Sequence, residues 1–421
     1  MVSCDGQLRI ALWLILLYMY RVAVLNSHPI QYFAPLYRRL AQEPDIDLTV
    51  YFCSRQGAEE YFDPGFGQRL KWDTSLLEGY KYKFLKNVRR QDQVAGFWSL
   101  INFEVVRELR TNKYDALWVN GHNFATYLIG IGAARWLKIP VLMRCETHLL
   151  LQRSRLKRAI RKPLMRYFYN RLCDVCLPIG TRNREFYLAH GVDNARMFTV
   201  PYAVDNAYFT EATSAFKNRS ETKNELGLPL RLPLVLSVSK MLLGKKLMDL
   251  LVAFHRIRKS GVEAALVFVG SGEQEMKLRD YVREHELPDV YFFGFRNQSE
   301  LPRFYAVADI FVFPSASETW GLSLNEAMCA GLPVIASRDI GAVPDLVRQG
   351  ENGFAFESGN EDELVDYMRR LLGSSERRKL MGVQSRKIIS HWDYERCVLG
   401  VRTALESVSR QHSWSAESEP A

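Results

Sequence analysis

Two glutamates with seven residues between them, Glu318 and Glu326, have the type and spacing expected at a site for a polar ligand. They lie in the segment SASETWGLSLNEAMCAGLPVIAS, residues 315–337. Within it, LSLNEAMCA predicts a short helix that begins near Gly321 and Leu322. Unpaired N–H groups at a helix start attract anions, and a glycine lets a ligand approach the backbone. A diphosphate bound there would have a carboxylate on each side, one towards a sugar and one towards a ribose.

The residues around this helix predict the elements that position it. The apolar run DIFVFPS before it and LPVIAS after it are typical of buried strands. Gly331 is suited to cap the end of the helix, and Pro333 prevents its continuation. The unit is therefore strand, loop, helix, strand. An ordinary α/β crossover with surface glutamates would explain the helix, but not a carboxylate beside the turn at Trp320 and Gly321.

The string WGLSLNEAM, followed by a glycine and PVIAS, resembles the retaining nucleotide-sugar glycosyltransferases of family 4, group 1 type. The resemblance extends from Val22 to Ser409 and is strongest in the second half. It implies the GT-B architecture, in which two Rossmann-like α/β domains with doubly wound parallel sheets face each other across a cleft. The alternation of strand and helix patterns in both halves also favours this fold class.

The sequence predicts five regions. Residues 1–20 are a hydrophobic extension, residues 21–202 an acceptor-side domain, and residues 203–390 a domain that binds a nucleotide sugar. Residues 391–410 should form a helix that packs back on the first domain, and residues 411–421 a disordered tail. We place the hinge at VPYAVD and the polar stretch that follows it.

The resemblance assigns most donor contacts to the second domain. In the string SKMLLGKKLMDLL, Lys240 and Lys245 match the positions that contact the diphosphate, and Lys246 is an alternative to Lys245. Glu326 would hold the ribose hydroxyls, and Glu318 would contact the sugar and support positive charge at its anomeric carbon. The other residues expected at the donor are Gly270, Gly272, Phe295, Gly321, Leu322 and Ser323.

The first domain should supply the acceptor side. His122 follows the predicted strand DALWVN, where parallel sheets bind ligands, so we predict a catalytic role, with packing or capping as the alternative. His28 and Gln31 occupy a loop where many relatives have two glycines, and both are candidates for acceptor contacts. Arg144 and Glu146 either frame the cleft on this side or form a structural ion pair.

The predicted reaction is transfer of a sugar from a nucleoside diphosphate sugar to an acceptor hydroxyl, with retention at the anomeric carbon and with Glu318, Lys245 and His122 as catalytic residues. Cations and amides would meet the charge of the departing diphosphate, so we expect neither a metal nor a cofactor. The acceptor would be a carbohydrate or a lipid-linked sugar, in surface polysaccharide or glycolipid synthesis. The alternatives are a sugar-nucleotide epimerase, a phosphorylase, or a non-catalytic subunit that binds sugar nucleotides.

Composition is consistent with this reading. The 421 residues suffice for two α/β domains, and a net charge of +9 favours anionic partners. Seven scattered cysteines suggest a reducing, cytoplasmic compartment. Cys173 and Cys176 form a single CxxC inside an apparent strand, which favours core thiols over a metal site.

Two further segments leave alternatives open. The stretch Arg153–Arg171 carries eight basic residues and no acid. It is either a solvated helix face or a surface for an anionic membrane or a phosphorylated acceptor, and no nucleic-acid motif accompanies it. A peripheral location at the inner face of a membrane would follow from the second reading. Residues 10–20 are apolar but too short to span a bilayer, so we favour an upstream extension, with Met19 as the start, over a signal-like anchor.

Overall fold

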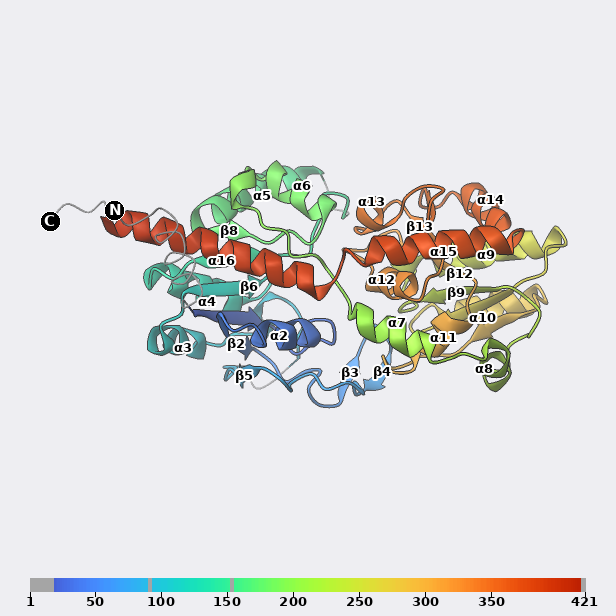
Figure 1. Cartoon of the computed structure of the whole chain (residues 1–421), viewed down its shortest axis with the longest axis horizontal. Coiled ribbons are helices and arrows are strands. Elements are labelled where there is room, and N and C mark those ends of the chain that lie inside the picture. The colour runs from blue at the N-terminus through green and yellow to red at the C-terminus, as the bar shows by residue number, and fades with distance from the viewer. Residues whose placement is uncertain (1–18, 90–92, 152–154, 418–421) are drawn as a thin grey trace, which may run out of the picture.

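The computed structural model describes residues 19–89, 93–151 and 155–417, and consists of two α/β lobes side by side (Figure 1). Each lobe is built on a six-stranded, fully parallel sheet, with strand orders β5-β2-β1-β6-β7-β8 and β11-β10-β9-β12-β13-β14. The predicted fold class is therefore confirmed.

The first lobe contains all strands up to β8 and the helices between them. Its sheet strands are β1 (Tyr20–Asn26), β2 (Ile46–Phe52), β5 (Lys81–Phe84), β6 (Ala116–Asn120), β7 (Val141–Arg144) and β8 (Val175–Cys176). Its helices are α2 (Ala34–Ala41), α3 (Glu104–Asn112), α4 (Ala125–Trp136), α5 (Arg155–Tyr167) and α6 (Thr181–Ala189), with a π-helical continuation of α5 at Phe168–Leu172. Short 3-10 turns occupy Phe97–Ser99 and Asn194–Arg196.

The second lobe repeats this plan. Its strands are β9 (Leu234–Val238), β10 (Ala265–Val269), β11 (Val290–Phe292), β12 (Ile310–Phe313), β13 (Val334–Ser337) and β14 (Gly353–Phe356). Its helices are α9 (Leu247–Lys259), α10 (Glu275–Glu284), α11 (Leu301–Val307), α12 (Leu322–Cys329), α13 (Val343–Leu346), α14 (Glu361–Leu372) and α15 (Ser375–Ile389), with a 3-10 turn at Leu243–Lys245.

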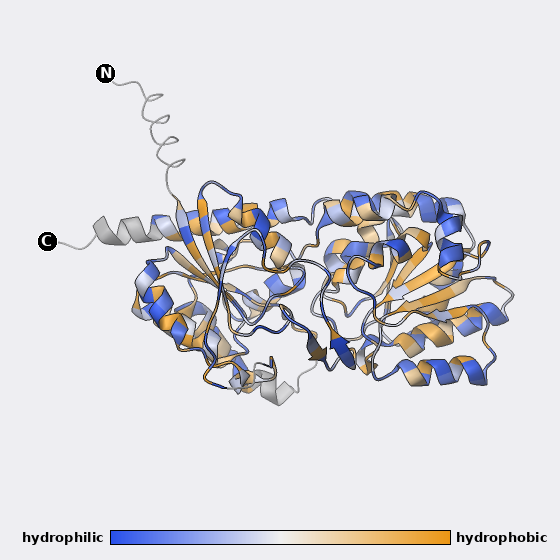
Figure 2. Ribbon diagram, turned by 90° about the horizontal axis from the view of Figure 1, so that it is seen from below, coloured by the Kyte–Doolittle hydropathy of each residue, from blue (hydrophilic) through white to orange (hydrophobic). Residues whose placement is uncertain are grey.

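Both sheets have apolar residues on both faces, because helices cover each side. The strands β9 and β10 are buried along their whole length, and Figure 2 shows the strands of both lobes as predominantly hydrophobic. Purely parallel sheets occur almost only where helices cover both faces. Because the strands are parallel, their carboxyl ends all lie at one edge of the sheet. Ligands of such sheets bind outside that edge.

The last helix crosses from the second lobe to the first. The helix α16 (Tyr394–Glu417) lies along the first lobe (Figure 1), where Cys397, Val401 and Leu405 join the core that contains Trp118 of β6. The side chain of Arg402 also forms ion pairs with Glu43 and Asp45 of the first lobe. This helix continues to Glu417, so a disordered tail from residue 411 is not what the structure shows. The extension predicted for residues 1–20 lies outside the described residues up to residue 18.

The polar stretch after the hinge and the segment between β2 and β5 both contain regular structure. The polar stretch after the hinge forms two helices, α7 (Asn206–Ser214) and α8 (Arg219–Glu225). Asp205 and Asn218 cap them, since their side chains accept hydrogen bonds from backbone N–H groups of the first turn. Between β2 and β5, the strands β3 (Tyr61–Asp63) and β4 (Gln68–Leu70) pair as an antiparallel hairpin beside the second lobe (Figure 1).

Candidate active site

The carboxyl ends of the two sheets enclose a cavity of about 400 Å³. Both lobes contribute to it. From the first lobe come His28, Ile30, Gln31, Tyr32, Tyr61, Asp63, Phe66 and Trp72. From the second come Lys240, Lys245, Gly270, Phe295, Glu318, Gly321, Leu322, Ser323 and Glu326, among others. Most residues predicted at the donor therefore lie together in one cleft.

Glu318 and Lys245 form a hydrogen-bonded ion pair in this cleft, and each side chain is less than one-fifth exposed. Lys245 ends the 3-10 turn after β9, and Glu318 lies in the loop after β12. A hydrogen bond from the Ala316 N–H to the Gly244 carbonyl joins the two loops at 2.9 Å. Lys246, the alternative to Lys245, instead pairs with Asp249 at 3.8 Å and is not among the residues that line the cavity.

The carboxyl group of Glu326 is 1% exposed and accepts two tyrosine hydrogen bonds. The Tyr305 hydroxyl donates to it at 2.7 Å from within the second lobe, and the Tyr32 hydroxyl donates at 2.9 Å from the first. Burial raises the pKa of Glu326 to about 7, against the opposing effect of these two hydrogen bonds. Glu326, the residue predicted to bind the ribose, thus joins the two lobes in this structure.

The helix α12 begins at Leu322, directly after Gly321, whose φ of 101° is in the left-handed region. A Cβ atom at Gly321 would lie 2.7 Å from the ring of Phe313, so a side chain there would be strained by both backbone and space. The first residues of the helix line the cleft, as do Glu318 and Glu326. Gly270 has a different reason for being glycine, since its Cβ atom would lie 1.9 Å from the Ser239 carbonyl oxygen.

Lys240 contacts a residue that the sequence analysis did not single out. Its ammonium group donates to both carboxylate oxygens of Asp63 at 2.9 Å, across the cleft. Phe295 packs edge-on against Phe66, with ring centroids 4.7 Å apart. Gly272 is near this contact, since its Cβ atom would lie 3.0 Å from the Gly65 carbonyl oxygen, but it is not among the residues lining the cavity.

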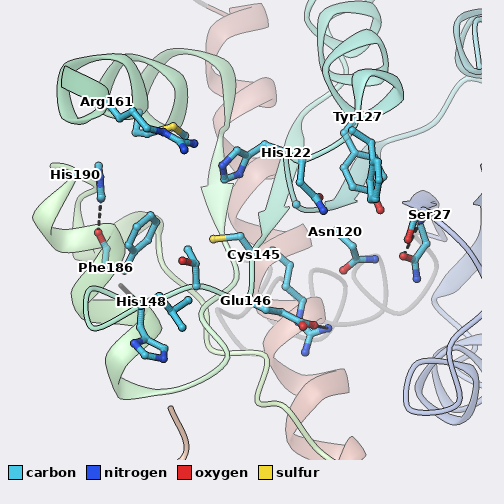
Figure 3. Close-up of a pocket in the computed structure, with 18 of the residues that line it drawn as sticks. Ser27, Asn120, His122, Tyr127, Cys145, Glu146, His148, Arg161, Phe186 and His190 are labelled. Atoms are coloured by element: carbon cyan, nitrogen blue, oxygen red, sulfur yellow. Dashed lines mark hydrogen bonds and ion pairs between the residues drawn. The ribbon is translucent and has the colours of Figure 1, made fainter. Parts of the chain in front are cut away.

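The residues predicted on the acceptor side are divided between two cavities. His28 and Gln31 line the cleft, and burial lowers the pKa of His28 to about 4, which keeps its ring neutral. His122, Arg144 and Glu146 instead line a cavity of about 350 Å³ within the first lobe (Figure 3). The structure therefore does not bring His122 together with Glu318 and Lys245. The two cavities are neighbours, because Ile30 lines both.

Arg144 is the most deeply buried charge of the first-lobe cavity, at 1% exposure. Its guanidinium group lies against the rings of both Phe33 and Tyr202, 4.7 and 4.8 Å from their centroids. Glu146 approaches it at 3.8 Å, and burial raises the pKa of that carboxyl while Arg144 opposes the rise. Among the described residues, Nε and Nη1 of Arg144 have no hydrogen-bond partner.

Four residues of these sites escaped the sequence analysis. Tyr32, Tyr305 and Asp63 belong to the cleft, and His148 shares a 2.9 Å hydrogen bond through its Nε2 with the Glu318 carbonyl oxygen. Three of them are defined by a partner in the other lobe, and Tyr305 by a partner 21 residues away. Only the position of His148, just after the strand PVLMR, carried a usable signal.

The described residues hold neither a cluster of metal ligands nor a helix that could span a membrane. Within residues 19–89, 93–151 and 155–417 no three His, Cys, Asp or Glu side chains are grouped as a metal site would require. Cys173 and Cys176 are buried free thiols. No helix of the same part of the chain has both the length and the apolar character needed to cross a bilayer.

Comparison with known proteins agrees with this geometry. Residues 218–388 match the family described as glycosyl transferases group 1. Sulfoquinovosyl transferase SQD2 of Arabidopsis thaliana is 29% identical over 286 residues, which cover 66% of this chain and 54% of that protein. Alpha-monoglucosyldiacylglycerol synthase of Streptococcus pneumoniae is 30% identical over 220 residues, 51% of this chain and 49% of that protein. The chain thus matches about half the length of these curated relatives.

Solved structures are similar over nearly the whole chain. Anabaena HepE in complex with UDP superposes with a TM-score of 0.72 at 18% identity, covering 92% of this chain and 100% of that one. WaaG, a glycosyltransferase involved in lipopolysaccharide biosynthesis, gives a TM-score of 0.61 at 15% identity, with coverage of 91% and 98%. At these identities the likeness establishes the fold.

The buried Glu326 makes stability depend on pH. Its pKa rises from 4.5 to about 7 on folding, so between these pH values the folded protein binds more protons than the unfolded chain. Stability should therefore fall as pH rises from about 4.5 to 7. Glu326→Gln has no carboxyl group to lose a proton, so it lacks this fall in stability. Its free energy of unfolding minus that of wild type should increase by about 3 kcal/mol as pH rises from 4.5 to 8. Urea unfolding at several pH values measures it.

The exposed Glu211 on α7 offers a matched control. Glu211→Gln should leave the wild-type pH dependence intact. If the curves for wild type and Glu326→Gln run parallel across this range, the carboxyl of Glu326 does not carry the pH effect.

Proposed function

We propose that this chain, whose residues 218–388 match the family described as glycosyl transferases group 1, is a retaining glycosyltransferase that uses a nucleoside diphosphate sugar. The observation that carries the proposal is the arrangement at the start of α12. There the Glu318–Lys245 pair, the first residues of the helix and Glu326 line one cleft between two parallel sheets.

The cleft has the charges that departure of a diphosphate needs. Lys240, Lys245 and the N-terminus of α12 would stabilise the negative charge that develops on the leaving diphosphate. The lysine ammonium group is a compact charge with rotatable donors on a flexible stem. Lys240 and Lys245 can therefore follow the phosphates as the bond between the sugar and the diphosphate lengthens. No metal or cofactor is part of this mechanism.

The two glutamates would act on different parts of the donor. Glu326 would exchange its hydrogen bond from Tyr32 for ribose hydroxyls, and Glu318 would face the sugar and stabilise positive charge at the anomeric carbon. That carbon loses its bond to the diphosphate oxygen, which takes the electron pair, and gains a bond to the acceptor hydroxyl. With retention, the acceptor arrives on the face that the diphosphate leaves, so the departing oxygen is well placed to accept the hydroxyl proton.

The acceptor would enter through the first lobe. The cavity there adjoins the cleft at Ile30 and presents Arg144, Glu146 and His122 to a polar ligand. The matched relatives are named for sulfoquinovosyl transfer and for glucosyldiacylglycerol synthesis, and WaaG for lipopolysaccharide biosynthesis. We therefore propose a carbohydrate or lipid-linked acceptor, in glycolipid or surface polysaccharide synthesis.

The helix α5 is the proposed contact with an anionic membrane. Ile160, Leu164 and Tyr167 are spaced for one face of this helix and are each at least 60% exposed. Basic residues flank them, as the charge of an anionic lipid surface requires. Arg161 and Met165 of the same helix line the first-lobe cavity, so the membrane would lie close to where the acceptor binds.

The roles of the two glutamates predict different kinetic profiles. Glu326→Gln should weaken binding of both free nucleotide and donor by roughly 1.5–3 kcal/mol. Glu318→Gln should lower turnover roughly 100-fold or more with little change in nucleotide affinity, because its contact strengthens only in the transition state. Lys245→Ala should reduce both. A thermal-shift panel of nucleotide sugars identifies the donor, calorimetry with UDP and GDP gives affinities, and single-turnover release of nucleoside diphosphate gives rates.

Lys246→Ala is the matched control, since that lysine neighbours Lys245 but pairs with Asp249. It should change neither quantity. Identical profiles for the two Gln variants would contradict the division of roles. Full activity in both would contradict the proposed site, and a product that is an epimerised nucleotide sugar would contradict transfer.

The membrane contact predicts a loss of vesicle binding. The double variant Ile160→Gln with Leu164→Gln should bind vesicles of phosphatidylglycerol and phosphatidylcholine at least tenfold more weakly, because each buried apolar side chain contributes about 1.5–3 kcal/mol. Flotation measures the bound fraction. Leu380→Gln with Val383→Gln, two equally exposed residues on α15, is the control and should bind as wild type does. If the α5 variant floats with vesicles as wild type does, α5 is a solvated surface helix and not a membrane contact.

A further inference from the structure

A segment of the first lobe reaches the donor side of the second. Residues 61–74, here called the cross-cleft segment, include the hairpin β3–β4 and lie between the lobes (Figure 1). The Ser271 hydroxyl donates to the Phe66 carbonyl oxygen at 3.0 Å, and Asn297 Nδ2 donates to the Lys71 carbonyl oxygen at 2.9 Å. Further along, the Ser299 N–H donates to Asp73 at 3.3 Å.

Asp63 makes the charged contact of this segment. Its Oδ1 accepts hydrogen bonds from the N–H groups of Gly65 and Phe66, at 2.8 and 3.1 Å, and so holds the hairpin turn. Lys240 then donates to both carboxylate oxygens, and its ammonium group also lies 4.6 Å from the centre of the Phe66 ring. Asp63 is largely buried, with an 11% exposed side chain, against 36% for Lys240.

The same ammonium group is one of the cations proposed for the diphosphate. A Lys ammonium has three donors, and two hydrogen bonds to one carboxylate occupy most of them. A phosphate that binds Lys240 must therefore compete with Asp63, and the carboxylate itself would repel the phosphate at this distance. Lys245 differs from Lys240, because its partner Glu318 belongs to the same lobe. The Lys245–Glu318 ion pair therefore holds no segment of the first lobe in place.

We infer that Asp63 occupies the anion position of Lys240 while the cleft is empty, and that a diphosphate displaces it and thereby releases the cross-cleft segment. This rests on the proposed function for the identity of the diphosphate ligand. Asp63 is then a positioning residue that sets donor affinity. Its hydrogen bonds to Gly65 and Phe66 are independent of Lys240, so the hairpin turn keeps its fold after release. The ion pair couples donor binding to this segment, and the hydrogen bonds of Ser271, Asn297 and Ser299 must open as well when residues 61–74 move.

The test uses inorganic pyrophosphate as the probe and calorimetry on the full chain. Asp63→Asn keeps an oxygen for the two backbone N–H groups but removes the charge from Lys240, so pyrophosphate should bind about tenfold more tightly than to wild type. Asp73→Asn is the control, since Asp73 lies in the same segment and contacts Ser299 rather than a lysine. It should bind pyrophosphate as wild type does. Adding Lys240→Gln to Asp63→Asn should abolish the gain.

Equal or weaker pyrophosphate binding by Asp63→Asn overturns the inference, as does no binding to either protein. Hydrogen exchange of wild type gives a second test that needs no variant. Amides of residues 64–70 should exchange faster with saturating pyrophosphate, and unchanged or slower exchange overturns the release. The outcomes also separate the two proposals. Tighter pyrophosphate binding without turnover of any nucleotide sugar supports the Asp63 exchange and contradicts the transferase.

Discussion

A buried carboxyl group shared by both lobes is the constraint on which the cleft depends. Glu326 accepts hydrogen bonds from Tyr305 in its own lobe and from Tyr32 in the other, far from solvent. A buried carboxyl group without hydrogen-bond partners would cost several kcal/mol, so these two hydroxyls stabilise the group, while its burial raises its pKa to about 7. The lobes are thus held together through a residue that the proposed ligand would also contact.

The other charges of the cleft are compensated in the same way. Lys245 pairs with Glu318 and Lys240 with Asp63, so each cation has a carboxylate partner in this structure. Such pairing lowers the cost of holding lysines in a partly closed site. It also means that a ligand gains only the difference between its own contacts and those it replaces. Affinity for a nucleotide sugar would therefore depend on first-lobe residues as much as on the cations themselves.

The sequence predicts what depends on neighbouring residues. The unit from β12 to β13 and the start of α12 follow from local apolar patterns, and the positions of Lys240 and Lys245 from the family resemblance of one short string; the structure has these elements and places both lysines in the cleft. Partners that lie far apart in the chain could not be predicted this way. The hydrogen bond of Tyr32 with Glu326 spans 294 residues, and that of Lys240 with Asp63 spans 177. The separation of His122 from the cleft is likewise a result of packing, since its ring contacts Phe168 and Tyr169.

The first-lobe cavity and the cleft have different physical characters, and this bears on how one substrate could follow another. The cleft is bounded by both lobes, so its shape depends on their contacts through Tyr32 and Asp63. The first-lobe cavity is lined by one lobe alone, with α5 on one side and Arg144 buried at another. Its contact with the second lobe includes the hydrogen bond of His148 with the Glu318 carbonyl oxygen at 2.9 Å. In the proposed function, the exposed apolar face of α5 would place a membrane beside this cavity, whereas the donor would enter the cleft between the lobes. A membrane-bound acceptor could then stay in place while the donor exchanges, because the residues that line the acceptor cavity belong to the first lobe.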